Sequence, residues 1–378
     1  MPHEIARVHA TALKVEVDFS DLGVARTRAT SVCHAEIETK DGLTGHGLSY
    51  LSDGTVIAQA INAVAAPAIL GRNAMAHEKI WRDLYWTMTG SGQSGYACHA
   101  ISAIDLALWD LKGKALGMPI WQLLGGARER LGVYATLGLP MMTREHLVEM
   151  AKRVVARGFK AIKMQVGRPG LDQRSGEKSL MDILRDDETR IAAVRDAVGK
   201  DIEIAMDGSC RFDLPHAVEL AHRAEAYGIA WYEEPVMQND VRLMADLRRR
   251  TSIPVSAGQN EGLTARFRDM LIAGAVDVIQ PNVSVAGGIT QCIKIAALAD
   301  AFNVPIASGG GGCPYHNMHV QAGLANGTMV EYQTSSAQAC EKLYQGYPVI
   351  RDGSLTLPDA PGLGFEPRPE AIKEFAVA

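Results

Sequence analysis

The stretch IEIAMDGSCRFDLPHAVELAHRAEAYGIAWYEEP, residues 202–235, contains the repeating unit that decides the fold. A short apolar run ends at Asp207, a helical pattern follows, and a second short apolar run ends at Glu233 and Glu234. Short apolar strands that alternate with helices are typical of parallel sheets, because the helix returns the chain to the edge where the strand began. The stretch therefore predicts a β–α–β unit.

The same rhythm extends in both directions from this stretch. Between Val133 and Gln333 the candidate strands are VYATLG, AIKMQVG, IEIAMDG, IAWYEEP, IPVSAGQ, DVIQPNV, VPIASGG and TMVEYQ. Eight such strands separated mostly by helical patterns favour an α/β fold with a closed parallel barrel. A doubly wound open sheet is the alternative, but no GxGxxG motif follows the first strand.

The first third of the chain has a different pattern. Residues 6–51 alternate between polar and apolar side chains and contain the turn-rich run DGLTGHG, which predicts antiparallel strands and a hairpin. Residues 56–70 and 95–116 then carry apolar side chains at helical spacing. We therefore expect an α+β unit before the barrel, with the Pro/Gly-rich tail LTLPDAPGLGFEP returning over it.

Composition narrows the class of protein. The 378 residues are 47% hydrophobic and 21% charged, with a net charge of −5 and no basic block, so we expect a small-molecule partner and no nucleic acid. The six cysteines include no CxxC pair, and we expect free thiols in a reducing compartment. No apolar run of about 18 residues occurs, so we expect no membrane partner and a cytoplasmic location.

Polar side chains follow the predicted strands at the ends that share one face of a barrel. They are Lys163, Gln165, Asp207, Glu233, Glu234, Gln259, Asn282 and Glu331. Asp207 and Glu233 are 26 residues apart, and Glu233 and Gln259 are also 26 apart, which places them on successive units. Two carboxylates and an amide carbonyl together suit Mg²⁺. A single Asp or Glu after a strand, in contrast, is more often a helix cap or a solvated loop residue than a metal ligand.

The run AIDLALWDLKGKALGMPIWQLLGG, residues 103–126, resembles the mandelate racemase and muconate-lactonizing enzymes of the enolase superfamily. The lysine strand, MDGS, WYEEP, the GQ position and the PGLGFE tail follow in that family's order. The resemblance implies an α+β capping domain (1–125), a modified (β/α)7β barrel of the TIM type (126–345) and a C-terminal segment (346–378) that returns to the cap. It also implies one Mg²⁺ per subunit and a homo-oligomer, a dimer or an octamer.

The resemblance further implies that a base removes the proton α to a substrate carboxylate, forming an enediolate that Mg²⁺ stabilises. Lys163 is the predicted base, and it needs a depressed pKa to be neutral near pH 7. The predicted metal ligands are Asp207, Glu233 and Gln259, with Glu261 as the alternative to Gln259. Glu331 matches a glutamate that contacts the substrate carboxylate; its alternative role is that of a buried salt-bridge partner.

Several positions depart from the family pattern. The usual KxK pair of the second strand is Lys163 and Gln165 here, and the usual aspartate of the sixth strand is Asn282. Gln165 and Asn282 are therefore expected to contact substrate rather than to transfer protons.

The loop SGGGGCPYHNMH near the seventh strand supplies His316 and His319. We favour His316 as general acid and expect His319 to bind substrate, although either could be a packing residue. In the loop SDLGVARTR, Arg26 and Arg28 are candidates for substrate contact, or they are solvated.

With one recognisable base, dehydration is favoured over racemisation, because a racemase needs groups on both faces of the α-carbon. We predict an acid-sugar dehydratase acting on aldonates or aldarates in carbohydrate catabolism. A racemase, epimerase or cycloisomerase is the second reading, and a catalytically inactive binding relative is the third.

Overall fold

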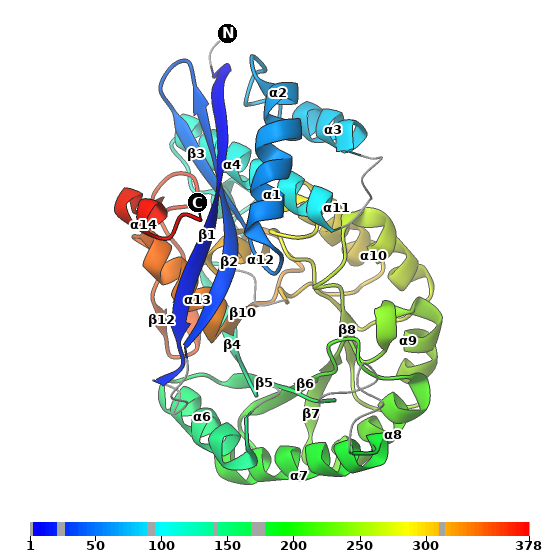
Figure 1. Ribbon diagram of the computed structural model, residues 1–378. Coiled ribbons are helices and arrows are strands. Elements are labelled where there is room, and N and C mark those ends of the chain that lie inside the picture. Colours follow the sequence, from blue (N-terminus) through cyan, green and yellow to red (C-terminus); the bar gives the residue numbers. More distant parts are fainter. Residues whose placement is uncertain are drawn as a thin grey trace.

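The computed structural model describes residues 3–20, 27–88, 95–138, 142–167, 178–309 and 314–377. Figure 1 shows two parts, a cap of strands and helices and a ring of strands covered by helices below it. The N-terminal elements form most of the cap, and the C-terminal segment, red in Figure 1, lies beside them.

A three-stranded antiparallel sheet forms the centre of the cap. Its strands are β1 (Ile5–Asp18), β2 (Thr27–Thr39) and β3 (Thr44–Ser49), which confirms the predicted strands and hairpin. The helices are α1 (Gly54–Ala60), a π-helical turn (Ile61–Ala65), α2 (Ala66–Ile69), α3 (His77–Met88) and α4 (Tyr96–Leu116). The helix α4 lies directly on β3, and a Cβ atom on Gly47 would lie 1.9 Å from the Ala103 carbonyl oxygen. Glycine at this position therefore permits the close approach of helix and strand.

The second part is a ring of parallel strands that alternate with helices. The strands are β4 (Arg130–Leu137), β5 (Ala161–Gln165), β6 (Glu203–Asp207), β7 (Ile229–Glu233), β8 (Val255–Ala257), β9 (Val278–Ile279) and β10 (Met329–Gln333). The helices between them are α6 (Arg144–Ala156), α7 (Leu180–Val198), α8 (Leu214–Ala224), α9 (Val241–Arg248), α10 (Leu263–Ile272), α11 (Gly288–Ala301) and α12 (Pro314–Gly323). The short helix α5 (Ile120–Leu123) precedes β4.

The ring closes through a segment too short to form a regular strand. Ile306 bridges Ile279 of β9 on one side and Gly327, just before β10, on the other. Because β10 also pairs with β4, the hydrogen bonding runs around the whole ring. The predicted modified (β/α)7β barrel is confirmed.

The C-terminal segment returns to the cap after α13 (Thr334–Leu343). The strands β12 (Ile350–Arg351) and β13 (Ser354–Thr356) form a hairpin on β4, and β11 (Tyr344–Gln345) pairs with β14 (Glu366–Pro367). After α14 (Pro369–Glu374), the Val377 amide donates to the Ala12 carbonyl in β1.

Two buried aspartates of α4 connect the cap to the barrel and to the tail. Asp105 accepts hydrogen bonds from the amide and the hydroxyl of Thr290, in the first turn of α11, and burial raises the pKa of Asp105 to about 7. Asp110 accepts from the amides of His46 and Leu363, and burial raises its pKa to about 6. The aspartates of the run AIDLALWDLKGKALG therefore hold separate parts of the chain together.

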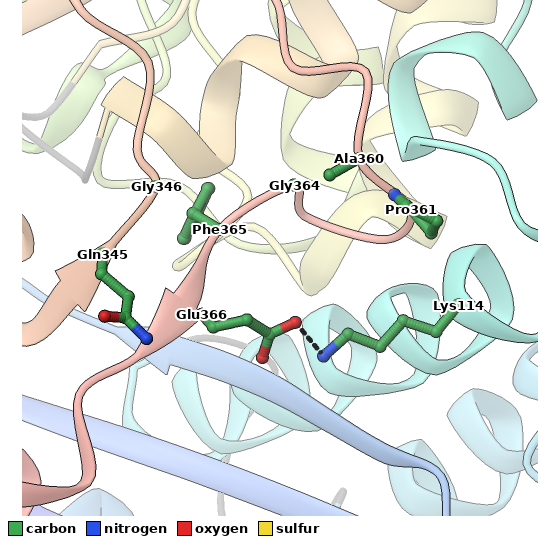
Figure 2. Close-up of a pocket in the computed structure, with 8 residues that line it drawn as sticks. All are labelled: Lys114, Gln345, Gly346, Ala360, Pro361, Gly364, Phe365 and Glu366. Atoms are coloured by element: carbon green, nitrogen blue, oxygen red, sulfur yellow. Dashed lines mark ion pairs between the residues drawn. The ribbon is translucent and has the colours of Figure 1, made fainter.

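The same helix pairs with the tail at the surface. Figure 2 shows Glu366 of the tail reaching Lys114 of α4, with 2.7 Å between Lys114 Nζ and Glu366 Oε1. Lys114 also lies 2.9 Å from Asp110. A cavity of about 540 Å³ lies beside the Lys114–Glu366 pair, and the tail residues 360–366 form most of its wall.

Two expectations from composition can be compared with the structure. Cys33, Cys98, Cys210 and Cys292 are free, but Cys340 is disulfide-bonded, so the expectation of free thiols is wrong for Cys340. Over the described residues, no helix has both the length and the apolar character needed to cross a membrane.

Candidate active site

A polar cavity of about 180 Å³ lies at the carboxyl ends of the barrel strands. Its walls are formed by Leu51, Thr136, Leu137, Gln165, Asp207, Ser209, Gln259, Asn260, Glu331 and Gln333. Leu51 comes from the cap, just after β3, and the other residues come from strand ends and the loops that follow them. The cap therefore contributes Leu51 to the wall of this cavity.

Lys163 of β5 lies fully buried beside this cavity. Its Nζ atom donates a hydrogen bond to Glu233 and lies 3.1 Å from Glu331 and 3.5 Å from Asp207. Ile162 and Met164, its neighbours along the strand, alternate to the opposite face of the sheet. Strand alternation thus places one ammonium group among carboxylates from β6, β7 and β10.

These carboxylates control the protonation of Lys163. Burial alone favours the neutral amine, but Glu233 and Glu331 outweigh it and raise the pKa of Lys163 well above its ordinary value. The depressed pKa expected from the sequence was expected beside Mg²⁺, and without a cation among them the three carboxylates close to Nζ act against it.

Glu233 is fully buried and hydrogen-bonded on both oxygens. Its Oε1 atom accepts from Lys163, while its Oε2 atom accepts from Gln280 Nε2 at 2.7 Å and from Trp231 Nε1 at 3.4 Å. Burial raises the pKa of Glu233 to about 8, and Lys163 opposes this shift. The Lys163 ammonium therefore stabilises the charged form of Glu233.

The predicted metal ligands can be tested for their fit to a cation. Asp207 and Glu233 are direct register partners on β6 and β7, and the Lys163 ammonium lies between them. Gln259 donates its Nε2 to Glu234 at 2.9 Å, so its amide oxygen is the end that is left for a cation. In the described part of the chain, no three His, Cys, Asp or Glu side chains form a metal-binding group alone. Two carboxylates and one amide oxygen are donor types that a small hard cation such as Mg²⁺ prefers.

Glu234 points away from Glu233 and organises a shell of amides. Its backbone has a positive φ of 40°, a left-handed conformation that is uncommon for a residue other than glycine. Its carboxylate accepts from Asn239 Nδ2 at 2.9 Å, from Gln259 Nε2 at 2.9 Å and from Asn260 Nδ2 at 2.7 Å. Gln259 is therefore held in place by a carboxylate behind it.

The alternative ligand Glu261 lies outside the Lys163 cluster. Its carboxylate pairs with Arg266, with 2.9 Å between Oε2 and Nε, and also accepts from Asn239 Nδ2 at 3.1 Å. The structure therefore brings Gln259, and not Glu261, to the cavity that Asp207 lines.

The two histidines lie away from the cavity on α12. The His316 ring is buried against Phe365 and Tyr344, with centroids 5.1 and 5.6 Å away, and neither ring nitrogen has a hydrogen-bond partner among the described residues. His319 Nε2 lies 3.2 Å from the Leu363 carbonyl oxygen. Burial lowers the pKa of both histidines to about 3. Both side chains face the C-terminal segment.

The predicted substrate-binding residues are also separated. Gln165 lines the cavity and donates to the Ser209 hydroxyl at 3.0 Å. Asn282 is buried in the loop after β9, where its oxygen accepts from the Ser284 amide and hydroxyl, and it does not line the cavity. Arg28 is exposed at the start of β2, and Arg26 lies outside the described residues.

Family comparisons agree with this architecture. Residues 146–371 match the family described as "Enolase C-terminal domain-like", and residues 9–125 match the N-terminal domain of mandelate racemase and muconate lactonizing enzyme. The chain belongs to the mandelate racemase/muconate lactonizing enzyme family of the enolase superfamily.

Named relatives in this mandelate racemase/muconate lactonizing enzyme family act on acid sugars. A 3,6-anhydro-alpha-L-galactonate cycloisomerase from Streptomyces coelicolor is 32% identical, over 90% of each chain. An arabinonate dehydratase from Saccharolobus solfataricus is 30% identical, over 90% of this chain and 89% of that one. The crystal structure of L-talarate dehydratase from Polaromonas sp. JS666, complexed with Mg and L-glucarate, has a TM-score of 0.86 at 27% identity, covering 99% and 98%.

Sequence reasoning missed several residues that line the cavity, among them Thr136, Ser209, Gln333 and Leu51. The signal for Gln333 was present, because it lies two residues after Glu331 on one strand and so shares its face. Thr136 is the register partner of both Lys163 and Gln333, and only strand pairing could show this. Leu51 arrives from the cap, and no local pattern indicates it.

Proposed function

We propose that the protein is a Mg²⁺-dependent dehydratase of acid sugars, aldonates or aldarates. It would remove the proton α to the substrate carboxylate and eliminate the β-hydroxyl group to give a 2-keto-3-deoxy acid. The observation that carries this proposal is the Lys163 ammonium, buried among Asp207, Glu233 and Glu331 beside a polar cavity. The two dehydratases among the named relatives support the reaction class.

Asp207, Glu233 and Gln259 are the residues that would hold one Mg²⁺ per subunit. When bound, this ion stabilises the negative charge that develops on the substrate carboxylate as the α-proton leaves. The register pairing of Asp207 with Glu233 supports the assignment, as does the anchoring of Gln259 by Glu234.

Lys163 is the proposed base, with Nζ as the atom that takes the α-proton. Its ammonium group must first release a proton to solvent in the cavity, because only the neutral amine has a lone pair, and the ion pairs with Asp207 and Glu233, which favour the charged form, must open for this to happen. Afterwards, Nζ carries a proton beside the cavity and can return it to the departing β-hydroxyl on the same face of the substrate. One residue would then serve as base and as acid, which fits the position of His316 away from the cavity.

The remaining cavity residues suit a polyhydroxylated substrate. Glu331 accepts a hydrogen bond from the Thr136 hydroxyl, which holds its carboxylate in place. Gln165, Ser209 and Gln333 add amide and hydroxyl groups, which can donate to and accept from sugar hydroxyls. We propose that these groups orient the substrate while Glu331 contacts its carboxylate.

A cycloisomerase is the second candidate, favoured by the Streptomyces coelicolor relative. Its first step would use the same base, but its product would keep every atom of the substrate. Mass spectrometry separates the two readings, since only a dehydratase product has lost one water molecule.

The test is to incubate the protein with a panel of aldonates and aldarates in D₂O, with Mg²⁺ or with EDTA. We expect release of a 2-keto acid with Mg²⁺ only, and a fall of at least ~10³-fold in rate for Lys163→Ala. Lys160→Ala is the matched control, because Lys160 is exposed just before the same strand and should retain full activity. Unchanged activity in Lys163→Ala would show that the proposed base is wrong.

A further inference from the structure

A second cavity, of about 610 Å³, lies outside the barrel wall, where α6, α13 and the end of β1 meet. Figure 1 shows these elements on the side of the barrel where β1 crosses α13. The described residues that line it are Asp18, Arg153, Arg157, Tyr332, Thr334, Gln338, Glu341, Lys342 and Arg368. Four of these side chains are cationic and two are anionic, in a chain whose net charge is −5. The side chains that line the cavity thus carry a local excess of positive charge.

Arg157, at the end of α6, is held by aromatic rings. Its guanidinium carbon lies 5.5 Å from the centroid of the Tyr332 ring and 5.7 Å from that of Phe159. No carboxylate among the described residues pairs with it. Contact with aromatic faces restrains the guanidinium plane without neutralising its charge, which leaves a pre-oriented donor at the cavity.

Arg368, at the start of α14, is anchored by carbonyl groups. Its Nη1 atom donates to the carbonyl oxygens of Glu341 at 3.2 Å and Lys342 at 3.4 Å, in the last turn of α13. Within the described chain it too has no carboxylate partner. Arg153 differs, because its Nε lies 2.7 Å from Glu149.

The acidic side chains of the cavity are satisfied by hydroxyl groups. Glu341 accepts from the Tyr315 hydroxyl at 2.8 Å and from the Tyr332 hydroxyl at 3.4 Å. Asp18 accepts from the Ser20 hydroxyl at 2.7 Å. Neither carboxylate forms an ion pair with Arg157 or Arg368 among the described residues, so both guanidinium groups are available to a ligand.

We propose that this cavity binds a small dianion, a molecule with at least two negatively charged oxygens such as a phosphate ester or a dicarboxylate. Arg157 and Arg368 would hold it, because the planar guanidinium fork matches carboxylate and phosphate oxygens. The cavity is separate from the active-site cavity. Glu331 and Gln333 of β10 line the active-site cavity, while Tyr332 between them lines this one. A dianion bound here would contact the outer face of the strand that carries Glu331.

The test is isothermal titration of the full chain with inorganic phosphate and, separately, with succinate, at an ionic strength held constant with NaCl. We expect saturable binding of at least one probe, weakened at least tenfold by Arg157→Ala combined with Arg368→Ala. Tighter binding of phosphate indicates a phosphate ester as ligand, and tighter binding of succinate indicates a dicarboxylate. Arg157→Lys keeps the positive charge but lacks the planar guanidinium fork. We expect its affinity for the probe to lie between those of the parent protein and the double alanine variant, and this replacement disturbs the fold least.

Two controls complete the test. Arg144→Ala removes a cation from the same helix α6, but Arg144 pairs with Glu145 outside the cavity, so affinity should not change. Lys163→Ala should also bind the probe normally. The proposal is overturned if neither probe binds saturably at millimolar concentration, if the arginine variants bind like the parent protein, or if Lys163→Ala alone abolishes binding.

Discussion

Exchanging Gln259 for glutamate tests both its contact with Glu234 and its proposed role as a metal ligand. Gln259 Nε2 donates to Glu234 Oε2 at 2.9 Å, so Gln259→Glu places two buried carboxylates against each other. A hydrogen bond to a charged group contributes about 1.5–3 kcal/mol, and like-charge repulsion adds to its loss. In EDTA the free energy of unfolding should therefore fall by at least about 2 kcal/mol.

Mg²⁺ should reverse this loss, because the new carboxylate adds a negative charge to the proposed ligand set. At an effective dielectric constant of about 20, one added charge about 4 Å from another contributes up to about 4 kcal/mol. Even a tenfold gain in Mg²⁺ affinity would add about 1.4 kcal/mol at saturating Mg²⁺. Urea unfolding in EDTA and across a Mg²⁺ titration measures both effects.

Asn260→Asp is the matched control for this experiment. Asn260 Nδ2 donates to the same Glu234 oxygen at 2.7 Å, so its replacement should cause a similar loss of stability in EDTA. Asn260 is not a proposed ligand, so the Mg²⁺ affinity of the Asn260→Asp variant should stay close to that of the parent protein. Equal responses of the two variants to Mg²⁺ would refute Gln259 as a ligand. Unchanged stability of both in EDTA would refute the amide shell around Glu234.

Two further predictions concern buried titratable groups. Burial raises the pKa of Asp105 to about 7 from 3.8, so the folded protein keeps a proton that the unfolded chain releases, and stability should fall as pH rises from about 4 to about 7. Asp105→Asn should remove this slope. In urea unfolding, the free energy of unfolding of the variant should therefore rise relative to that of the parent protein between pH 5 and pH 8. An equal difference in free energy at both pH values would contradict the raised pKa. His316→Leu should keep activity within a few-fold and stability within about 1 kcal/mol, because neither His316 ring nitrogen has a hydrogen-bond partner in the described part of the chain. A ~10³-fold loss of activity in that variant, measured with an accepted substrate, would restore His316 as the general acid.

Much of the architecture was readable from the chain because it depends on local patterns. The strand from Ile202 to Asp207 and the one from Ile229 to Glu233 have short apolar runs bounded by helices, and each β–α unit returns the chain to one edge of the sheet. The step of 26 residues therefore predicted that Asp207 and Glu233 lie side by side, and they are register partners. The seventh strand was the hardest to predict, since among the residues that the structure describes it forms bridges to its neighbours through Ile306 alone.

The sequence by itself determined the barrel, the cap and the strand-end carboxylates, because hydrophobic periodicity and equal spacing act within one or two neighbouring elements. The tertiary structure decided which groups meet across the ring. It surrounded Lys163 with carboxylates that raise its pKa, turned Glu234 toward Gln259, and buried His316 against the returning tail. These contacts join residues far apart in the chain, and their energies depend on burial and charge proximity, which exist only once the ring has closed.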